Sequence, residues 1–163
     1  MSKGLVGKNL LKLDISNNAV NPYGAKALLH FLEQASSLQA LLIYNCGLGT
    51  LGAKEIALGL KGTPNLRTFS IGRNRMENAG IQAIAESIQY VPLLEELFIY
   101  QNTLRKEGLH PLFVQLLKHC KNLISFDLCD NFIRDEATTE MTNIIKNSLN
   151  LRNLNLSDCL NEG

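Results

Sequence analysis

The chain has 163 residues, of which 45% are hydrophobic and 19% charged, with 16 Lys and Arg against 15 Asp and Glu. This length is typical of one globular domain, and a net charge of +1 gives no general attraction to a phosphate backbone, so no nucleic-acid partner is expected. Lys8 and Lys12 interrupt any signal-peptide core, and no run of about 18 apolar residues exists, so we expect a protein that is neither exported nor membrane-bound.

One sequence frame, Leu-x-x-Leu-x-Leu-x-x-Asn, recurs six times along the chain with small substitutions. The first copy runs from Leu10 to Asn18. Its two inner apolar residues are two positions apart, which predicts a short strand with one face in the core. The residues between the inner apolar positions are expected on the opposite, open face: Asp14, Leu42, Ser70, Phe98, Asp127 and Asn155.

The last position of the frame holds Asn18, Cys46, Asn74, Asn102, Asn131 and Cys159, separated by 28, 28, 28, 29 and 28 residues. An asparagine here can hydrogen-bond the main-chain groups that a turn exposes, from repeat to repeat. We interpret Cys46 and Cys159 as small buried replacements rather than redox or metal-binding thiols. Because the chain has no C-x-x-C pair, all four cysteines are expected to be reduced, and the role of Cys120 and Cys129 stays open.

A helical pattern follows each of the first five frames, because apolar residues recur there at i, i+3, i+4 and i+7. In four units a glycine precedes this stripe, where we expect a tight turn into the helix: Gly24, Gly52, Gly80 and Gly108. The fifth stripe, Thr138, Met141, Thr142 and Ile145, contains two threonines. We expect that helix to be the least regular.

The order strand, turn, helix predicts an α/β leucine-rich-repeat solenoid that forms a single domain over residues 1–163. About five and a half repeats of 28 to 29 residues would form a horseshoe, with a parallel β-sheet on the concave face and α-helices on the convex face. Polar caps are not recognisable at either end, so we expect a piece of a longer solenoid, or else an unusually short one with frayed or partner-covered ends. Self-association is expected only through the exposed ends.

The sequence offers no catalytic constellation of its own. The three histidines, His30, His110 and His119, are not spaced as metal ligands, and the recurring glycines do not form a phosphate-binding loop. We therefore expect helix-surface positions for the histidines, and neither a cofactor nor a metal.

The repeat does not explain the polar turn Gly72-Arg73-Asn74-Arg75-Met76-Glu77-Asn78, in which only Asn74 and Met76 serve the architecture. The corresponding turns hold Tyr44-Asn45, Tyr100-Gln101, Cys129-Asp130 and Ser157-Asp158. Since equivalent positions of stacked repeats lie at the same height, these residues predict a mixed-charge strip along one edge of the horseshoe. Solvated turns on a scaffold are the alternative interpretation.

This turn resembles the hallmark G-R-N-R-L-E-N of the Ran GTPase-activating protein family, with Met76 in place of leucine. Other matching landmarks are Asn45-Cys46-Gly47-Leu48-Gly49, Gln101-Asn102, Asp130-Asn131 and Asp158-Cys159-Leu160, each in the corresponding repeat. Ribonuclease inhibitors and immune-receptor repeats share the 28-residue unit but not this turn motif. The resemblance covers nearly all of this chain and corresponds to the central repeats of the family.

The resemblance implies an activator that binds the GTP form of Ran through one edge of the horseshoe, with GTP and Mg²⁺ held by the GTPase. It also implies a location in the cytoplasm, including the cytoplasmic face of the nuclear envelope. The family is understood to work without an arginine finger, by holding the catalytic glutamine and a nearby tyrosine of the GTPase in place. The implied acting residue is Asn45, and the implied partner-binding residues are Arg73, Arg75, Glu77, Gln101, Asp130 and Asp158.

Two alternatives stay open. An arginine finger supplied by Arg73 or Arg75, as in many other GTPase activators, is the alternative mechanism. A non-catalytic module that holds a protein ligand in its concave face is the alternative function. Apolar and acidic side chains would there give a mixed surface suited to a protein partner: Leu42, Phe98 and Tyr100 beside Glu95, Glu96 and Asp127.

Overall fold

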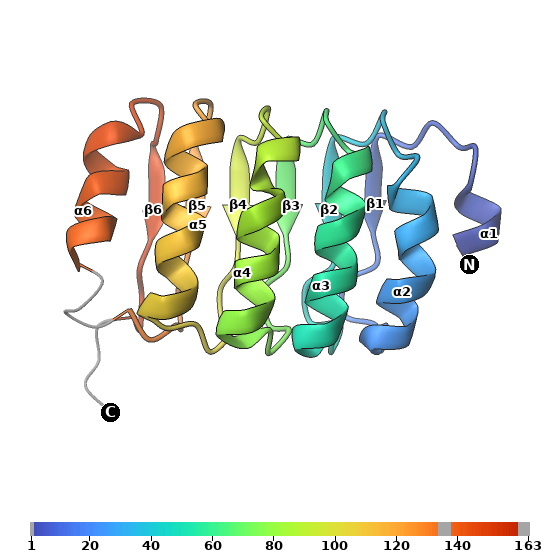
Figure 1. Cartoon of the computed structure of the whole chain (residues 1–163), viewed down its shortest axis with the longest axis horizontal. Helices are drawn as coiled ribbons and strands as arrows, with labels where there is room; N and C mark the ends of the chain where they lie inside the picture. Colours follow the sequence, from blue (N-terminus) through green and yellow to red (C-terminus); the bar gives the residue numbers. More distant parts are fainter. Residues whose placement is uncertain (1, 134–137, 160–163) are drawn as a thin grey trace.

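A computed structural model describes residues 2–133 and 138–159 of the chain (Figure 1). Six parallel strands form one sheet in the order of the sequence, which confirms the predicted α/β leucine-rich-repeat architecture. The strands are β1 (Lys12–Asp14), β2 (Ala40–Leu42), β3 (Thr68–Ser70), β4 (Glu96–Phe98), β5 (Ser125–Asp127) and β6 (Asn153–Asn155).

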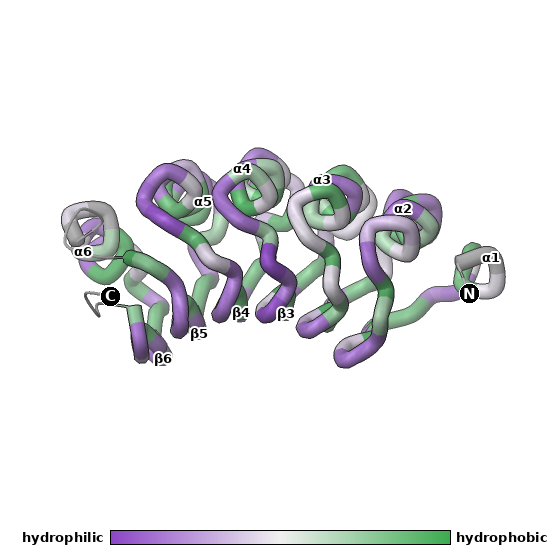
Figure 2. The backbone as a smooth tube through the Cα atoms, turned by 90° about the horizontal axis from the view of Figure 1, so that it is seen from below, coloured by the Kyte–Doolittle hydropathy of each residue, from purple (hydrophilic) through white to green (hydrophobic). Residues whose placement is uncertain are grey.

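Helices connect consecutive strands and cover one side of the sheet. Figure 2 shows the helices on the outer side of an arc and the strands on its inner, concave side. The α-helices are α1 (Ser2–Leu5), α2 (Asn21–Leu32), α3 (Gly49–Gly59), α4 (Glu77–Ser87), α5 (Lys106–His119) and α6 (Thr138–Asn147), and the 3₁₀ helices are η1 (Leu60–Gly62) and η2 (Ile88–Tyr90). None of the helices in the described part of the chain is long and apolar enough to span a bilayer.

The sheet register repeats the spacing of the sequence frame. Leu13 lies opposite Leu41, which lies opposite Phe69, and the series continues in the later strands. One predicted open-face residue is corrected by the structure, because Ser70 is only 4% exposed. Its register partners, Leu42 and Phe98, are larger and flank the small serine on both sides, so they cover it.

The predicted helical stripes form the core with the strands. All stripe residues of α3, α4 and α5, with the adjoining 3₁₀ turns, are buried: Ala53, Ile56, Ala57 and Leu60; Ile81, Ile84, Ala85 and Ile88; and Leu109, Leu112, Phe113 and Leu116. In α2 the predicted stripe is Ala25, Leu28, Leu29 and Leu32, of which Leu29 is only half-buried, and Phe31 is buried in addition. The stripe predicted for α6 is confirmed at Met141 and wrong at Thr142 and Ile145, which are exposed; Ile144 is the second buried residue. This stripe departs from the predicted pattern more than those of α3, α4 and α5, as expected from its threonines.

Asn74, Asn102 and Asn131 connect neighbouring repeats, as predicted, whereas the side chain of Asn18 in the first repeat bonds the carbonyls of Ile15 and Ser16 in its own repeat. Asn74 is fully buried, and its Nδ2 donates to the carbonyls of Ile43, Ile71 and Gly72 at 2.9–3.0 Å. Its Oδ1 accepts from the main-chain N–H groups of Cys46 and Leu48. Asn102 and Asn131 make equivalent bonds, so these side chains satisfy turn backbone that would otherwise be buried without partners.

The two cysteines in this column replace the asparagines, as predicted. Cys46 and Cys159 are buried, and their Sγ atoms donate to the carbonyls of Ile15 and Leu128 in the preceding repeats, at 3.3 and 3.0 Å. All four cysteines are free thiols. Burial raises the pKa of Cys120 to about 12, which makes this thiol a packing residue rather than a nucleophile.

The glycines that precede the helical stripes have a different role from the predicted one. Gly52 and Gly80 lie within the first turn of α3 and α4 rather than in the turn before them. A Cβ atom on Gly80 would lie 2.9 Å from the Cβ of Met76 and 3.1 Å from the Cβ of Ala53. These glycines therefore allow consecutive helices to pack closely, and the tight turns are made by other residues. Ala137, which holds the position of these glycines in the fifth unit, lies outside the described residues, as does Leu160 of the last matching turn.

The terminal repeats bury their core positions less completely than the central ones. Ile43, Ile71 and Ile99 are at most 1% exposed, whereas the equivalent Ile15 and Leu156 are half-buried. Each central strand has a complete repeat on both sides, and β1 and β6 each have one on one side only.

Candidate functional site

The candidate site is a column of turn residues, one per repeat, which we call the turn strip: Asn17, Asn45, Arg73, Gln101, Asp130 and Asp158. Each directly precedes the inter-repeat asparagine or cysteine, and each has a left-handed backbone with φ between 52° and 59°. Together they follow the carboxyl ends of the six strands, at the lower edge of the view in Figure 1. Five of these six residues are among the predicted site residues, and Asn17 is not.

Backbone hydrogen bonds place the strip residues in register. The N–H of Asn45 donates to the carbonyl of Gly72 at 2.9 Å, and the N–H of Arg73 donates to that of Tyr100 at 2.9 Å. Since the main chain and the adjacent inter-repeat asparagine are held inward, the strip side chains point outward, and all six are exposed. With strands about 4.8 Å apart, Asn45 and Asp158 are separated by roughly 20 Å. This span suits a protein partner better than a small ligand.

Arg75 and Glu77 lie beside the strip in two further columns. Both are exposed and both have left-handed backbones, with φ of 53° and 57°. The equivalent positions one repeat earlier hold Gly47 and Gly49, at φ of 64° and 58°. A non-glycine residue in this conformation costs on the order of 1 kcal/mol. The third turn therefore keeps long charged side chains at positions where glycine would be less strained.

The charges of the strip are separated along its length. The amides of Asn17 and Asn45 come first, then the guanidinium of Arg73 with Arg75 beside it, then the amide of Gln101, and acids occupy the last two positions. The pKa of the nearby Cys129 is raised, first by burial and then by the carboxylates of Asp127, Asp130 and Asp158. This raised pKa reflects a local excess of negative charge at the C-terminal part of the strip.

Asn45 is connected to the preceding repeat by side-chain hydrogen bonds. Its Nδ2 donates to Oδ1 of Asn17 at 2.9 Å, and Nδ2 of Asn17 donates to the phenol oxygen of Tyr44 at 3.2 Å. The N–H of Asn17 also donates to the carbonyl of Tyr44 at 3.0 Å. The exposed side-chain amide of Asn45 is thus hydrogen-bonded to Asn17, which is itself held by Tyr44.

Two half-buried tyrosines border the strip on the concave side. A Cβ atom on Gly72 would lie 2.6 Å from two ring atoms of Tyr100, so this glycine serves the architecture after all, by making room for that ring. The pKa of Tyr100 is raised, mainly by burial and then by Tyr44 and Asp127, while Arg73 acts in the opposite direction. The phenols and the strip therefore form one continuous surface.

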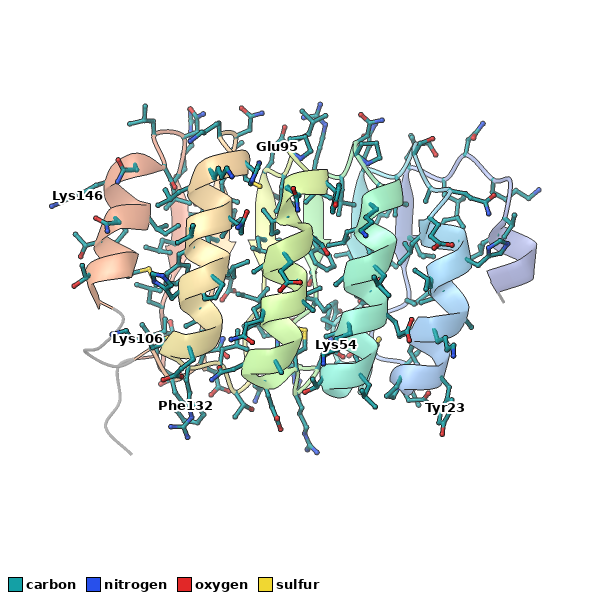
Figure 3. All side chains as sticks on the ribbon, in the orientation of Figure 1. Tyr23, Lys54, Glu95, Lys106, Phe132 and Lys146 are labelled. Atoms are coloured by element: carbon teal, nitrogen blue, oxygen red, sulfur yellow. The ribbon has the colours of Figure 1, made fainter. Side chains whose placement is uncertain are left out.

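Exposed apolar residues near the strip were missed by sequence reasoning. Phe132 occupies the column of Gly47 and Arg75, is 42% exposed, and lies with its ring centroid 5.3 Å from Cζ of Arg105. Tyr23, at the start of α2, is 86% exposed, and Figure 3 shows it at the same edge as Phe132. The signal available was positional, because an aromatic residue directly after an inter-repeat asparagine has no partner in the core.

The described residues contain no group of three His, Cys, Asp or Glu side chains that could hold a metal ion. His30 and His110 are exposed on α2 and α5, and His119 is half-buried on α5. The exposed amide, guanidinium and carboxylate groups of the strip can form hydrogen bonds and charge pairs.

Comparison with known proteins finds leucine-rich repeats in this chain and similarity to Ran GTPase-activating proteins. The family model for the leucine-rich repeat matches residues 8–29 and 63–85. The chain is 32% identical to the Ran GTPase-activating protein of Drosophila melanogaster, in an alignment that covers 73% of this chain and 22% of that protein. It is 29% identical to Ran GTPase-activating protein 1 of Saccharomyces cerevisiae, in an alignment that covers 91% of this chain and 40% of that protein.

The chain thus spans less than half the length of these relatives. Among solved structures, actin-binding site 2 of leiomodin-1 has a similar fold, with a TM-score of 0.70. The identity there is 18%, and the match covers 91% of this chain and 85% of the other. That likeness concerns the fold alone.

Proposed function

Since this chain belongs, over part of its relatives' length, to the leucine-rich-repeat family of Ran GTPase-activating proteins, we propose that it binds the GTP form of Ran in the cytoplasm and accelerates GTP hydrolysis. The turn strip with Arg75 and Glu77 is the docking surface in this proposal. The observation that carries it is the third turn, where three left-handed positions hold exposed charged residues. Backbone strain that is retained for exposed side chains favours a binding role over a solvated scaffold turn.

Asn45 is the residue that acts on the GTPase in this proposal. GTP hydrolysis requires an oriented water and neutralisation of charge on the transferring phosphoryl group, and GTP and Mg²⁺ belong to Ran. An uncharged amide cannot neutralise that charge, but it can hold a side chain of the GTPase by hydrogen bonds. Asn45 therefore suits an activator that orders the catalytic glutamine and a nearby tyrosine of its partner. Arg73 and Arg75 then contribute to docking.

The test compares three glycine variants, Asn45→Gly, Arg73→Gly and Arg75→Gly. Glycine is chosen because all three positions have left-handed φ angles, so each variant removes a side chain without adding strain. Single-turnover GTP hydrolysis by Ran and the affinity for Ran are measured for each. Asn45→Gly is expected to lower the stimulated rate more than tenfold with affinity within about threefold, whereas the arginine variants mainly lower affinity.

The opposite pattern would favour an arginine finger. If Arg73→Gly or Arg75→Gly alone removes the stimulation at saturating concentration and Asn45→Gly does not, then charge neutralisation is the mechanism and our assignment of Asn45 is wrong.

A non-catalytic binding module is the second candidate. It is favoured by the half-buried apolar side chains on the concave face, Leu42, Phe98 and Tyr100, next to the half-buried Glu96 and Asp127. Such a module would bind its partner and leave the rate of GTP hydrolysis unchanged.

A further inference from the structure

The amide group of Asn45 is not symmetric in its surroundings. One N–H of its Nδ2 donates to Oδ1 of Asn17, at 2.9 Å. Its Oδ1 accepts no hydrogen bond from the residues that the structure describes. The NH₂ group of an asparagine carries two N–H donors, so a partner can meet the second N–H and the acceptor oxygen, and the bond to Asn17 fixes the direction in which that oxygen points.

Asn17 is itself held from two directions. Its Nδ2 donates to the phenol oxygen of Tyr44 at 3.2 Å, and its N–H donates to the Tyr44 carbonyl at 3.0 Å. Tyr44 is half-buried on the concave face and directly precedes Asn45. The chain of contacts therefore runs from the phenol of Tyr44 through Asn17 to Asn45, and it links the first repeat to the second.

We propose that Asn17 is a positioning residue, which fixes the Asn45 amide so that its carbonyl oxygen faces the partner as a hydrogen-bond acceptor. The proposal rests on the function proposed above for Asn45. The atom presented in this proposal is the acceptor oxygen, so the partner group that binds it is a donor, such as a side-chain amide N–H or a hydroxyl. It also adds to the site the one strip residue that the family motif does not include.

The physical basis is preorganisation. An exposed asparagine rotates about its terminal torsion and presents oxygen and nitrogen in turn, so ordering it on binding costs free energy. The bond to Asn17 restricts that rotation before the partner arrives. In the proposed function, the Asn45 amide orders a catalytic residue of the GTPase. A restricted Asn45 amide orders that residue more accurately, and an error in its orientation lowers the rate of hydrolysis.

The position also sets which substitutions test the proposal. Asn17 has a φ of 59°, a conformation that Asn, Asp and Gly accept and other residues resist. Asn17→Gly removes the side chain and keeps the backbone. Asn17→Asp keeps an acceptor for Nδ2 of Asn45 and loses the donor to Tyr44. The pair therefore separates the orientation of Asn45 from the backbone geometry of the turn.

The experiment measures single-turnover GTP hydrolysis on Ran with the full 163-residue chain, for Asn17→Gly, Asn17→Asp, Asn45→Gly and the double variant Asn17→Gly/Asn45→Gly. The loss of one exposed positioning bond corresponds to a fall of about fivefold in the maximal rate for Asn17→Gly, with the affinity for Ran unchanged. Asn17→Asp should stay within about twofold of the wild type. In the Asn45→Gly background, Asn17→Gly should have no further effect, because it acts through Asn45.

A second readout does not depend on activity. The side-chain amide resonances of Asn45 in the free chain should move in Asn17→Gly and in Tyr44→Phe, and Asn17→Asp should keep them hydrogen-bonded. Thermal unfolding of each variant checks that the turn is intact.

The outcomes separate this inference from the proposed function. If Asn45→Gly lowers the rate and Asn17→Gly does not, the positioning role is wrong while the function of Asn45 stands. If Asn17→Asp is as slow as Asn17→Gly, Asn45 presents its nitrogen rather than its oxygen, and the assigned orientation is overturned. If Asn45→Gly itself has no effect, the function proposed for Asn45 fails, and the role of Asn17 fails with it.

Discussion

The second and third turns of the solenoid have left-handed backbone at the same three positions but hold different residues there. The second turn, Tyr44–Gly49, has two glycines among its three left-handed positions, and the third turn, Gly72–Glu77, has Arg73, Arg75 and Glu77 there. The inter-repeat side chain also differs, since the second turn uses Cys46 and the third uses Asn74. The third turn thus combines stronger internal hydrogen bonding with more backbone strain, and the docking role proposed for its exposed charges rests on that combination.

The largest effect is expected when the internal bonding of the two turns is removed. Asn74→Ala leaves buried main-chain groups of two repeats without partners, and we expect a loss of about 3 kcal/mol in the free energy of unfolding. Cys46→Ala removes weaker S–H bonds and should cost about 1 kcal/mol. Chemical denaturation of both variants measures the difference, and equal losses would mean that the two turns are held alike.

Exchanging the left-handed residues is expected to have a smaller effect, of opposite sign in the two turns. Gly47→Arg should destabilise the chain by about 1 kcal/mol because φ is 64°, although a Cβ atom at this position would have nothing within 4 Å. Arg75→Gly should stabilise it by about 0.5 kcal/mol, since relief of strain exceeds the entropy gained by the unfolded chain. The stabilised variant should bind Ran more weakly. A variant that is more stable and binds equally well would remove the functional explanation of the strain.

The smallest effect concerns the phenol next to the third turn. Burial raises the pKa of Tyr100 above its ordinary value of 10.0, so the associated stability is present below pH 10 and is lost as the pH rises through the folded-state pKa. Arg73 opposes this shift, so Arg73→Gly should raise the pKa of Tyr100 further. Ultraviolet difference titration of the tyrosines follows the change, with Tyr100→Phe identifying the signal. A lower pKa in Arg73→Gly would contradict the contact.

Much of the fold could be predicted because the repeat imposes it. Six equal frames determine the parallel sheet, and period 3.6 in the connecting segments determines the helices of the convex face. The prediction was wrong for two of the stripe residues of α6, Thr142 and Ile145, where the polar Thr142 leaves the buried face undetermined by periodicity. It was also wrong for Ser70, which is covered by its larger cross-strand neighbours. The repeated frame specifies neither the size of the side chains beside a given residue nor the rotation of a helix about its own axis.

The candidate site could be predicted in position but not in detail. The alignment of turns placed Asn45, Arg73, Gln101, Asp130 and Asp158 in one column, and the structure brings them together there. The hydrogen bonds of Asn17 and the packing of Tyr100 over Gly72 depend on contacts between repeats, and the sequence pattern does not specify such contacts. The roles of the individual strip residues stay predictions until the variants are measured.

The central claim is that the turn strip activates a GTPase and does more than bind it. The most direct measurement is single-turnover hydrolysis of GTP by Ran, with saturating wild-type chain and with the chain omitted. We predict an acceleration of at least tenfold, which disappears in Asn45→Gly. A complex that forms between Ran and the chain while hydrolysis continues at the intrinsic rate would contradict the claim.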